Sequence, residues 1–82
     1  MAAGTIRYWA GARAAAGTAE EAYDGDTLGA VLDAAAAAHG AALARVFTAA
    51  SFLVDGRRSG RDTALPDGAT IEVLPPFAGG SR

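Results

Sequence analysis

Cysteine and lysine are both absent from this chain of 82 residues, and histidine occurs once. Without cysteine there can be no disulfide, no thiolate zinc site and no thiol nucleophile. Without lysine there can be no Schiff base, and the lysine of a phosphate-binding loop is missing. The single histidine, His39, excludes a metal cluster built from histidines. A free-standing enzyme is therefore the interpretation that the sequence favours least.

The sequence also lacks a long apolar run and an excess of basic charge. Its longest uninterrupted apolar run, at 34–38, is far shorter than the ~20 residues that span a bilayer. The net charge is -2, with 9 acidic residues against 7 arginines, so nucleic acid is not an expected partner. No N-terminal pattern indicates a signal peptide, and we expect a cytoplasmic protein without a membrane partner.

The residues that are present predict one small folded domain, because 51% are hydrophobic and only 20% charged. Segments rich in β-branched and aromatic residues predict strands at 5–9, 18–23, 51–55 and 70–74, with a short extended piece near 61–65. Alternation in the first and last strands places four side chains on a buried face: Ile6, Tyr8, Ile71 and Val73. The other face carries Arg7 with Glu72, as an expected ion pair, and Trp9 with Leu74.

One helix is expected at 27–39, where apolar residues recur with helical spacing at Leu28, Val31, Leu32 and Ala35. Asp26 or Thr27 can cap its first turn, and Gly40 is expected to end it in a left-handed conformation. A further helical turn is expected at 41–47, while 10–17 is expected to be a connection with some helical propensity. His39 is expected at the C-terminus of this helix, where it interacts favourably with the helix dipole. The arginines at 57, 58 and 61 are expected to lie on a solvated hairpin or, alternatively, to contact an acidic partner.

The order of these elements predicts the α+β class and a β-grasp domain over 1–76. Such a domain has a mixed sheet of four to five strands packed on one main helix. Its first and last strands lie side by side and parallel at the centre of the sheet.

The C-terminal segment 77–82 is expected to be a flexible tail. Pro75 and Pro76 end the last strand, because proline donates no ladder hydrogen bond. Phe77 offers an anchor, and Gly79-Gly80 can pass through a slot too narrow for any Cβ. When extended, residues 77–80 reach ~13 Å. We interpret Trp9 and the segment 74–77 as a docking patch; the alternatives are a Trp9 that folds inward and a tail that is merely frayed.

The ending Leu74-Pro75-Pro76-Phe77-Ala78-Gly79-Gly80 resembles the tail of the MoaD family, the small ubiquitin-like sulfur carriers of molybdopterin synthase. The stretch from Trp9 through Arg13 to Gly17, and the segments 52–56 and 65–68, are also similar to this family. The resemblance thus covers nearly the whole chain and implies a ubiquitin-like β-grasp.

The resemblance implies chemistry at the chain terminus instead of at a side chain. A ubiquitin-activating-type adenylyltransferase (MoeB-type) would use ATP to adenylate Gly80, and a sulfur donor would then convert it to a thiocarboxylate. The large synthase subunit (MoaE-type) would accept the tail and transfer the sulfur. No cofactor is expected on the carrier itself. The residues expected to contact these partners are Trp9, Arg13, Leu74, Pro75, Pro76, Phe77, Ala78 and Gly79.

Two departures from the family pattern affect this interpretation. Ser81 and Arg82 follow Gly80 and would block its carboxylate, so trimming by a protease is expected unless the extension is an added end. Ala14 stands where the family often has an acid, which removes one partner contact. The alternatives are a ThiS-like carrier for thiazole, a carrier for cysteine, and a β-grasp binding module or protein modifier without sulfur chemistry.

Overall fold

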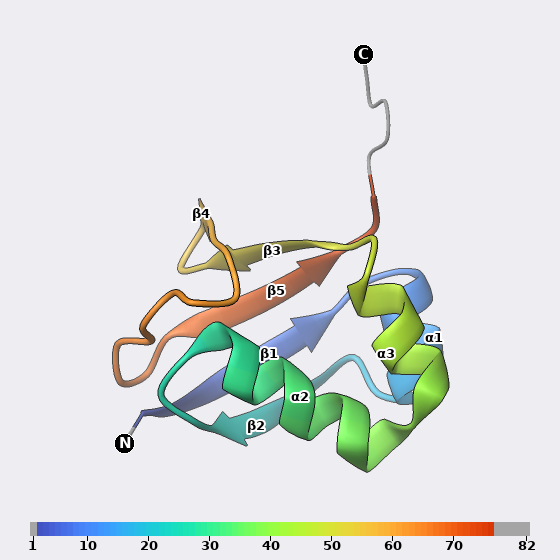
Figure 1. Cartoon of the computed structure of the whole chain (residues 1–82), viewed down its shortest axis with the longest axis horizontal. Coiled ribbons are helices and arrows are strands. Elements are labelled where there is room, and N and C mark those ends of the chain that lie inside the picture. Colours follow the sequence, from blue (N-terminus) through green and yellow to red (C-terminus); the bar gives the residue numbers. More distant parts are fainter. Residues whose placement is uncertain (1, 77–82) are drawn as a thin grey trace.

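In the computed structural model, which describes residues 2–76, the first and last strands lie side by side at the centre of one sheet. The strands β1 (Ala3–Tyr8) and β5 (Thr70–Leu74) are parallel, with Ile6 opposite Ile71 and Tyr8 opposite Val73. The sheet has five strands in the order β2-β1-β5-β3-β4 (Figure 1). The other strands are β2 (Glu20–Asp24), β3 (Ser51–Val54) and β4 (Arg57–Arg58). This is the predicted β-grasp, and the predicted tail lies outside the described residues.

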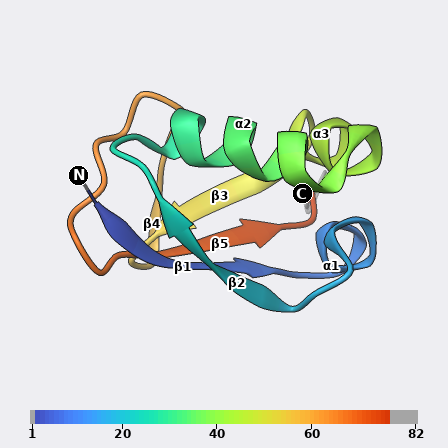
Figure 2. The ribbon, with the colours of Figure 1, turned by 90° about the horizontal axis from the view of Figure 1, so that it is seen from below.

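Three helices, α1 (Gly11–Ala16), α2 (Leu28–His39) and α3 (Ala41–Phe47), accompany the sheet. Figure 2 shows α2 and α3 on one side of the sheet, with α1 near the end at which β1 and β5 finish. The core therefore forms between this helical side and the apolar face of the strands. Its largest members with almost no exposed surface are Ile6, Tyr8, Leu28, Leu32, Leu43, Ile71 and Val73.

The main helix begins and ends close to its predicted limits. The Thr27 side chain accepts a hydrogen bond from the Ala30 N–H at 3.2 Å, as expected of a cap. The prediction for Gly40 was wrong in its conformation, since this residue has φ 103° and ψ -175°, outside the left-handed helical region. Only glycine adopts this extended conformation readily. It is needed because α3 begins at Ala41, so the chain must change direction at a single residue.

The predicted short strand near 61–65 was wrong. The second strand of the hairpin is instead β4, which pairs directly with β3 after the turn at Asp55 and Gly56. Both turn residues have positive φ, 50° and 81°, as a tight two-residue turn requires. Such a turn pairs the residues that directly flank it, Val54 with Arg57. The segment 61–65 forms only an isolated bridge between Thr27 and Ala64.

The loop after β4 is attached to α2. The Arg61 guanidinium lies 2.6 Å from the Asp33 carboxylate, and the Leu28 N–H donates to the Thr63 carbonyl at 3.0 Å. Arg61 is exposed, as are Arg57 and Arg58, but it pairs with α2 and lies outside the β3–β4 hairpin. No helix among residues 2–76 has the length and apolar character needed to cross a bilayer.

Candidate functional site

The site expected from the sequence lies where β1 and β5 end. Because the two strands are parallel, their carboxyl ends meet at the same edge of the sheet. The Trp9 N–H continues the ladder by donating to the Val73 carbonyl at 3.1 Å, so Trp9 leaves the sheet level with Leu74. Pro75 is half-buried and Pro76 exposed. Phe77, Ala78, Gly79 and Gly80 lie outside the described residues. The residues that lead into the predicted tail, Leu74 to Pro76, are its root, and the structure places this root beside Trp9.

Trp9 is the one large hydrophobic side chain that is exposed among the described residues, with 40% of its surface accessible. Its indole N–H donates to the Glu72 carboxylate at 3.2 Å, and the Arg7 guanidinium carbon lies 5.0 Å from the ring centroid. An indole held in this way by a carboxylate and a cation is ordered on the surface. The alternative in which Trp9 folds inward was therefore wrong.

The expected ion pair between Arg7 and Glu72 was also wrong. Arg7 has Glu72 as its neighbour on β5 and Glu20 as its neighbour on β2. Its Nε lies 3.5 Å from the Glu20 carboxylate, while Glu72 accepts from the Trp9 indole. Glu20 thus pairs with the Arg7 guanidinium and Glu72 binds the Trp9 indole. Both contacts lie on the face of the sheet that the helices leave open.

Arg13 lies apart from this cluster. It is exposed on α1, and its guanidinium makes no ion pair with any residue between 2 and 76. Trp9 leads into α1 through Ala10, whose φ of 51° is unusual for a residue with a side chain. The chain therefore turns sharply after Trp9, and no side-chain hydrogen bond or ion pair within residues 2–76 joins Arg13 to Trp9 or Glu72.

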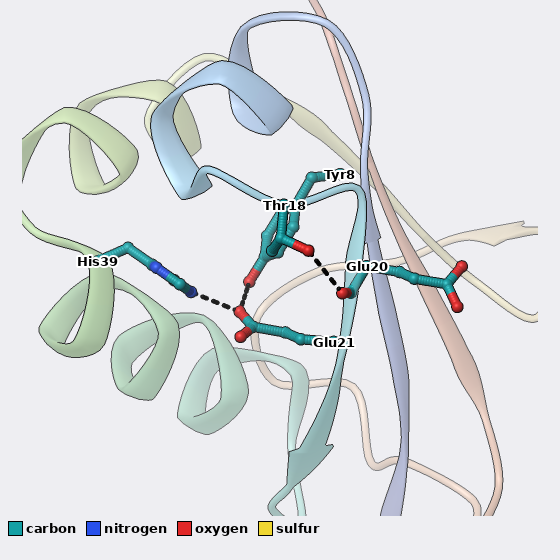
Figure 3. A network of polar contacts seen from close by, with 5 residues as sticks. All are labelled: Tyr8, Thr18, Glu20, Glu21 and His39. Carbon is teal, nitrogen blue, oxygen red and sulfur yellow. Dashed lines mark hydrogen bonds and ion pairs between the residues drawn. The ribbon is translucent and has the colours of Figure 1, made fainter.

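Sequence reasoning missed a polar cluster on the helical side of the sheet, formed by Tyr8, Glu21 and His39 (Figure 3). One oxygen of the Glu21 carboxylate accepts from the Tyr8 hydroxyl and contacts the His39 Nε2, both at 2.6 Å. The Tyr8 and His39 rings also pack edge to face, with centroids 6.2 Å apart. His39 therefore connects α2 to the sheet, in addition to its position at the helix end. The available signal was the alternation of β2, which turns Glu21 inward beside Tyr23.

The pKa of Glu21 reflects this cluster. Burial alone raises it, but the hydrogen bonds from Tyr8 and His39, together with the positive charge of protonated His39, bring it below its ordinary value. Burial and the neighbouring carboxylate raise the pKa of the Tyr8 hydroxyl, which therefore stays protonated and donates. The cluster thus favours an ionised Glu21 in the folded chain.

We predict that Glu21→Gln weakens the acid dependence of stability. A lowered pKa in the folded state stabilises the fold above the unfolded glutamate pKa of ~4.3, and this stabilisation is lost as the pH falls through the lower, folded value. The variant should lose about 1 kcal/mol at pH ~7. Denaturant unfolding measured from neutral pH down to pH ~3 should show the two curves converging.

The matched control is Glu20→Gln on the neighbouring residue. The Glu20 side chain is 59% exposed and makes only a surface pair with Arg7, so its loss should change stability by less than ~0.5 kcal/mol. Equal effects of the two substitutions, or a gap that stays constant with pH, would contradict the assignment of the acid-dependent stability to Glu21.

Comparison with known proteins identifies the family. A model described as the ThiS family matches residues 6–80. The chain belongs to the ThiS family. No match was found among curated proteins. The predicted resemblance to ubiquitin-like carriers of the MoaD and ThiS type is confirmed.

Solved structures with similar folds carry several names. The Haloferax volcanii small archaeal modifier protein 1 is 26% identical, with 93% of this chain and 99% of that chain covered and a TM-score of 0.80. Mycobacterium tuberculosis CysO is 23% identical, with 88% of this chain and 97% of that chain covered and a TM-score of 0.75. A Pyrococcus furiosus protein described as molybdopterin converting factor, subunit 1, is 22% identical, with coverages of 93% and 99% and a TM-score of 0.77. The last two likenesses concern the fold alone.

Family and fold together make this ThiS-family chain a sulfur carrier or a ubiquitin-like modifier. Carriers of this type partner with an adenylyltransferase and a synthase subunit. The family match runs through the described root of the tail to Gly80 and stops before Ser81. It therefore includes every residue that the sequence assigned to the tail site.

Proposed function

We propose that this protein is the sulfur-carrying small subunit of a molybdopterin synthase and that the reacting atom is the carbonyl carbon of Gly80. The observation that carries the proposal is the family match, which ends at Gly80, on a fold whose last strand ends beside an exposed tryptophan. The absence of cysteine, of lysine and of a second histidine agrees with it, because such a carrier needs no reactive side chain.

The chemistry follows from the weakness of a carboxylate as an electrophile. A partner adenylyltransferase would join the Gly80 carboxylate to the α-phosphate of ATP, with pyrophosphate as the leaving group. A persulfide sulfur would then displace AMP, and a thiol would cleave the sulfur–sulfur bond to leave a thiocarboxylate. Glycine leaves the carbonyl open to attack, and the sulfur anion is a good nucleophile toward a pterin precursor. Removal of Ser81 and Arg82 has to precede these steps.

The described part of the site has a docking role in this scheme. Trp9 is held on the face of the sheet by Glu72 and Arg7, close to the place where Leu74 and the prolines lead into the tail. An ordered, half-exposed indole contributes large contact area at low entropic cost. We assign partner contact to Trp9, Leu74, Pro75 and Pro76, with Arg13 as a separate charged contact on α1.

The proposal is tested with two chains, one ending at Gly80 and one retaining Ser81 and Arg82. Each is incubated with ATP, a ThiS-type activating enzyme and a persulfide donor, and its intact mass is measured. The shorter chain should gain the mass of one oxygen-to-sulfur exchange, and the longer chain should not change. No gain in the shorter chain, while a known carrier is converted in parallel, would sink the proposal. Copurification with a large molybdopterin synthase subunit, in preference to thiazole synthase, tests the pathway.

A second candidate is a protein modifier that forms an isopeptide bond with target lysines. It is favoured by the 26% identity to a small archaeal modifier protein. Recovery of the chain from cells in covalent adducts through Gly80, with no thiocarboxylate, would support this role.

A further inference from the structure

The outer edge of β2 has backbone groups that the sheet leaves unpaired. β2 is the first strand in the sheet order and has only β1 as a neighbour (Figure 1). The Tyr8 N–H donates to the Ala19 carbonyl and the Gly25 N–H to the Ala2 carbonyl. Hydrogen-bonded pairs alternate along an antiparallel ladder, so residues 19, 21, 23 and 25 face β1. The N–H and C=O groups of Glu20, Ala22 and Asp24 therefore point outward, and of these the Glu20 carbonyl accepts a hydrogen bond from the Thr18 hydroxyl at 3.0 Å.

A groove runs between this edge and α2. Its volume is about 170 Å³, and its apolar lining consists of Ala22, Tyr23, Val31, Ala34, Ala35 and Ala38. Ala34 and Ala38 are exposed, so small side chains on the helix leave the groove open. Cavities of ~150 Å³ hold one aromatic ring, and the groove is therefore large enough for one apolar side chain of an added strand.

The charge of this edge selects the occupant. β2 carries Glu20, Glu21 and Asp24 and no basic residue. Glu20 pairs with Arg7 of β1 and Glu21 contacts His39 of α2. Glu21 and Asp24 both line the groove, and the Asp24 carboxylate makes no ion pair with a residue of the described part. A second copy is disfavoured as the occupant, because antiparallel pairing of two β2 strands about Ala22 would place Glu20 opposite Asp24 twice. A segment with basic residues meets this edge without such repulsion.

We propose that the β2 edge binds an extended, basic segment of another protein by strand addition, with one of its apolar side chains seated in the groove. Main-chain bonds to Ala22 and Asp24 supply affinity, the groove selects the apolar side chain, and the carboxylates of the edge select the basic ones. The outer edge of β2 faces away from β1 and β5, so it is distinct from the root of the tail. The Glu20 carboxylate, which pairs with the Arg7 guanidinium over the Trp9 ring, is the point where this edge and the Trp9 surface meet. The ThiS-family chain thus has a second docking site that leaves its tail free for chemistry.

The test uses the full chain labelled with ¹⁵N and three synthetic peptides. The probe alternates lysine and valine over seven residues; one control replaces lysine by glutamate and the other replaces valine by serine. The probe should shift the amide signals of Ala22 and Asp24 and slow their hydrogen exchange. Each control peptide should bind about tenfold or more weakly. Because no activating enzyme or sulfur donor is present, the outcome is independent of the sulfur-carrier proposal.

Two substitutions on α2 provide a matched pair. Ala38→Phe fills the groove and should weaken probe binding about tenfold, whereas Ala37→Phe, exposed but outside the groove, should leave it unchanged. Ala22→Pro, which removes one outward N–H at an edge that tolerates proline, should also weaken binding. Signals that shift around Trp9 instead, equal effects at 37 and 38, equal binding of the serine peptide, or dimerisation through β2 would overturn the proposal.

Discussion

Gly80→Val, in the chain that ends at residue 80, should reduce thiocarboxylate formation by at least ~100-fold. A branched Cβ next to the carbonyl hinders both the adenylation and the attack of sulfur, and it cannot pass through a slot shaped for glycine. The yield after a fixed time with ATP, activating enzyme and persulfide donor is measured by intact mass.

The control for this variant is Gly60→Val in the loop after β4. This glycine has ordinary backbone geometry, and the nearest atom to a Cβ placed there is an Asp62 carboxylate oxygen at 3.5 Å. Its conversion should match that of the unsubstituted chain. If the Gly80→Val chain formed thiocarboxylate as fast as the unsubstituted chain, the reaction would not depend on access to the carbonyl of residue 80.

Gly4→Ala should destabilise the fold by about 3 kcal/mol. A Cβ at this position would overlap the Ala69 carbonyl oxygen and lie 2.7 Å from the Tyr23 hydroxyl oxygen. The Tyr23 hydroxyl donates to that same carbonyl at 2.7 Å in the interior, so the methyl group would disrupt a buried hydrogen bond. For a domain of this size the melting temperature should fall by roughly 12–24 °C, measured by thermal unfolding.

Gly11→Ala is the matched control, because no atom lies within 4 Å of a Cβ built there. Gly11 is the first residue of α1, where alanine is the better helix former, so stability should stay level or rise by up to ~1 kcal/mol. If the Gly4→Ala protein had the same melting temperature as the Gly11→Ala control, this would contradict the close packing of Tyr23 over Gly4.

The framework of the fold could be predicted because its signals are local. The spacing of Leu28, Val31, Leu32 and Ala35 defines α2, and the alternation of Ile71 and Val73 defines β5. The element order then left one economical arrangement. The open position of Trp9 followed from the same alternation, since it places this residue on the face without helices.

Long-range choices between partners could not be predicted. Arg7 has an acid on each side, and the sequence does not reveal that the indole of Trp9 occupies Glu72. His39 contacts Glu21 because the packing of α2 on the sheet brings the end of the helix next to β2, and this packing is not encoded locally. The tight turn at 55–56 decided where β4 pairs. Asp55-Gly56 is a local signal for such a turn, and the expected strand near 61–65 did not follow from it.

The intact mass of the protein purified from its own cells tests the central claim most directly. The account predicts a chain whose last residue is Gly80, part of it heavier by the exchange of one oxygen for sulfur. A population that ends uniformly at Arg82 and contains no sulfur-bearing species, in cells that are producing the sulfur-containing product, would contradict it.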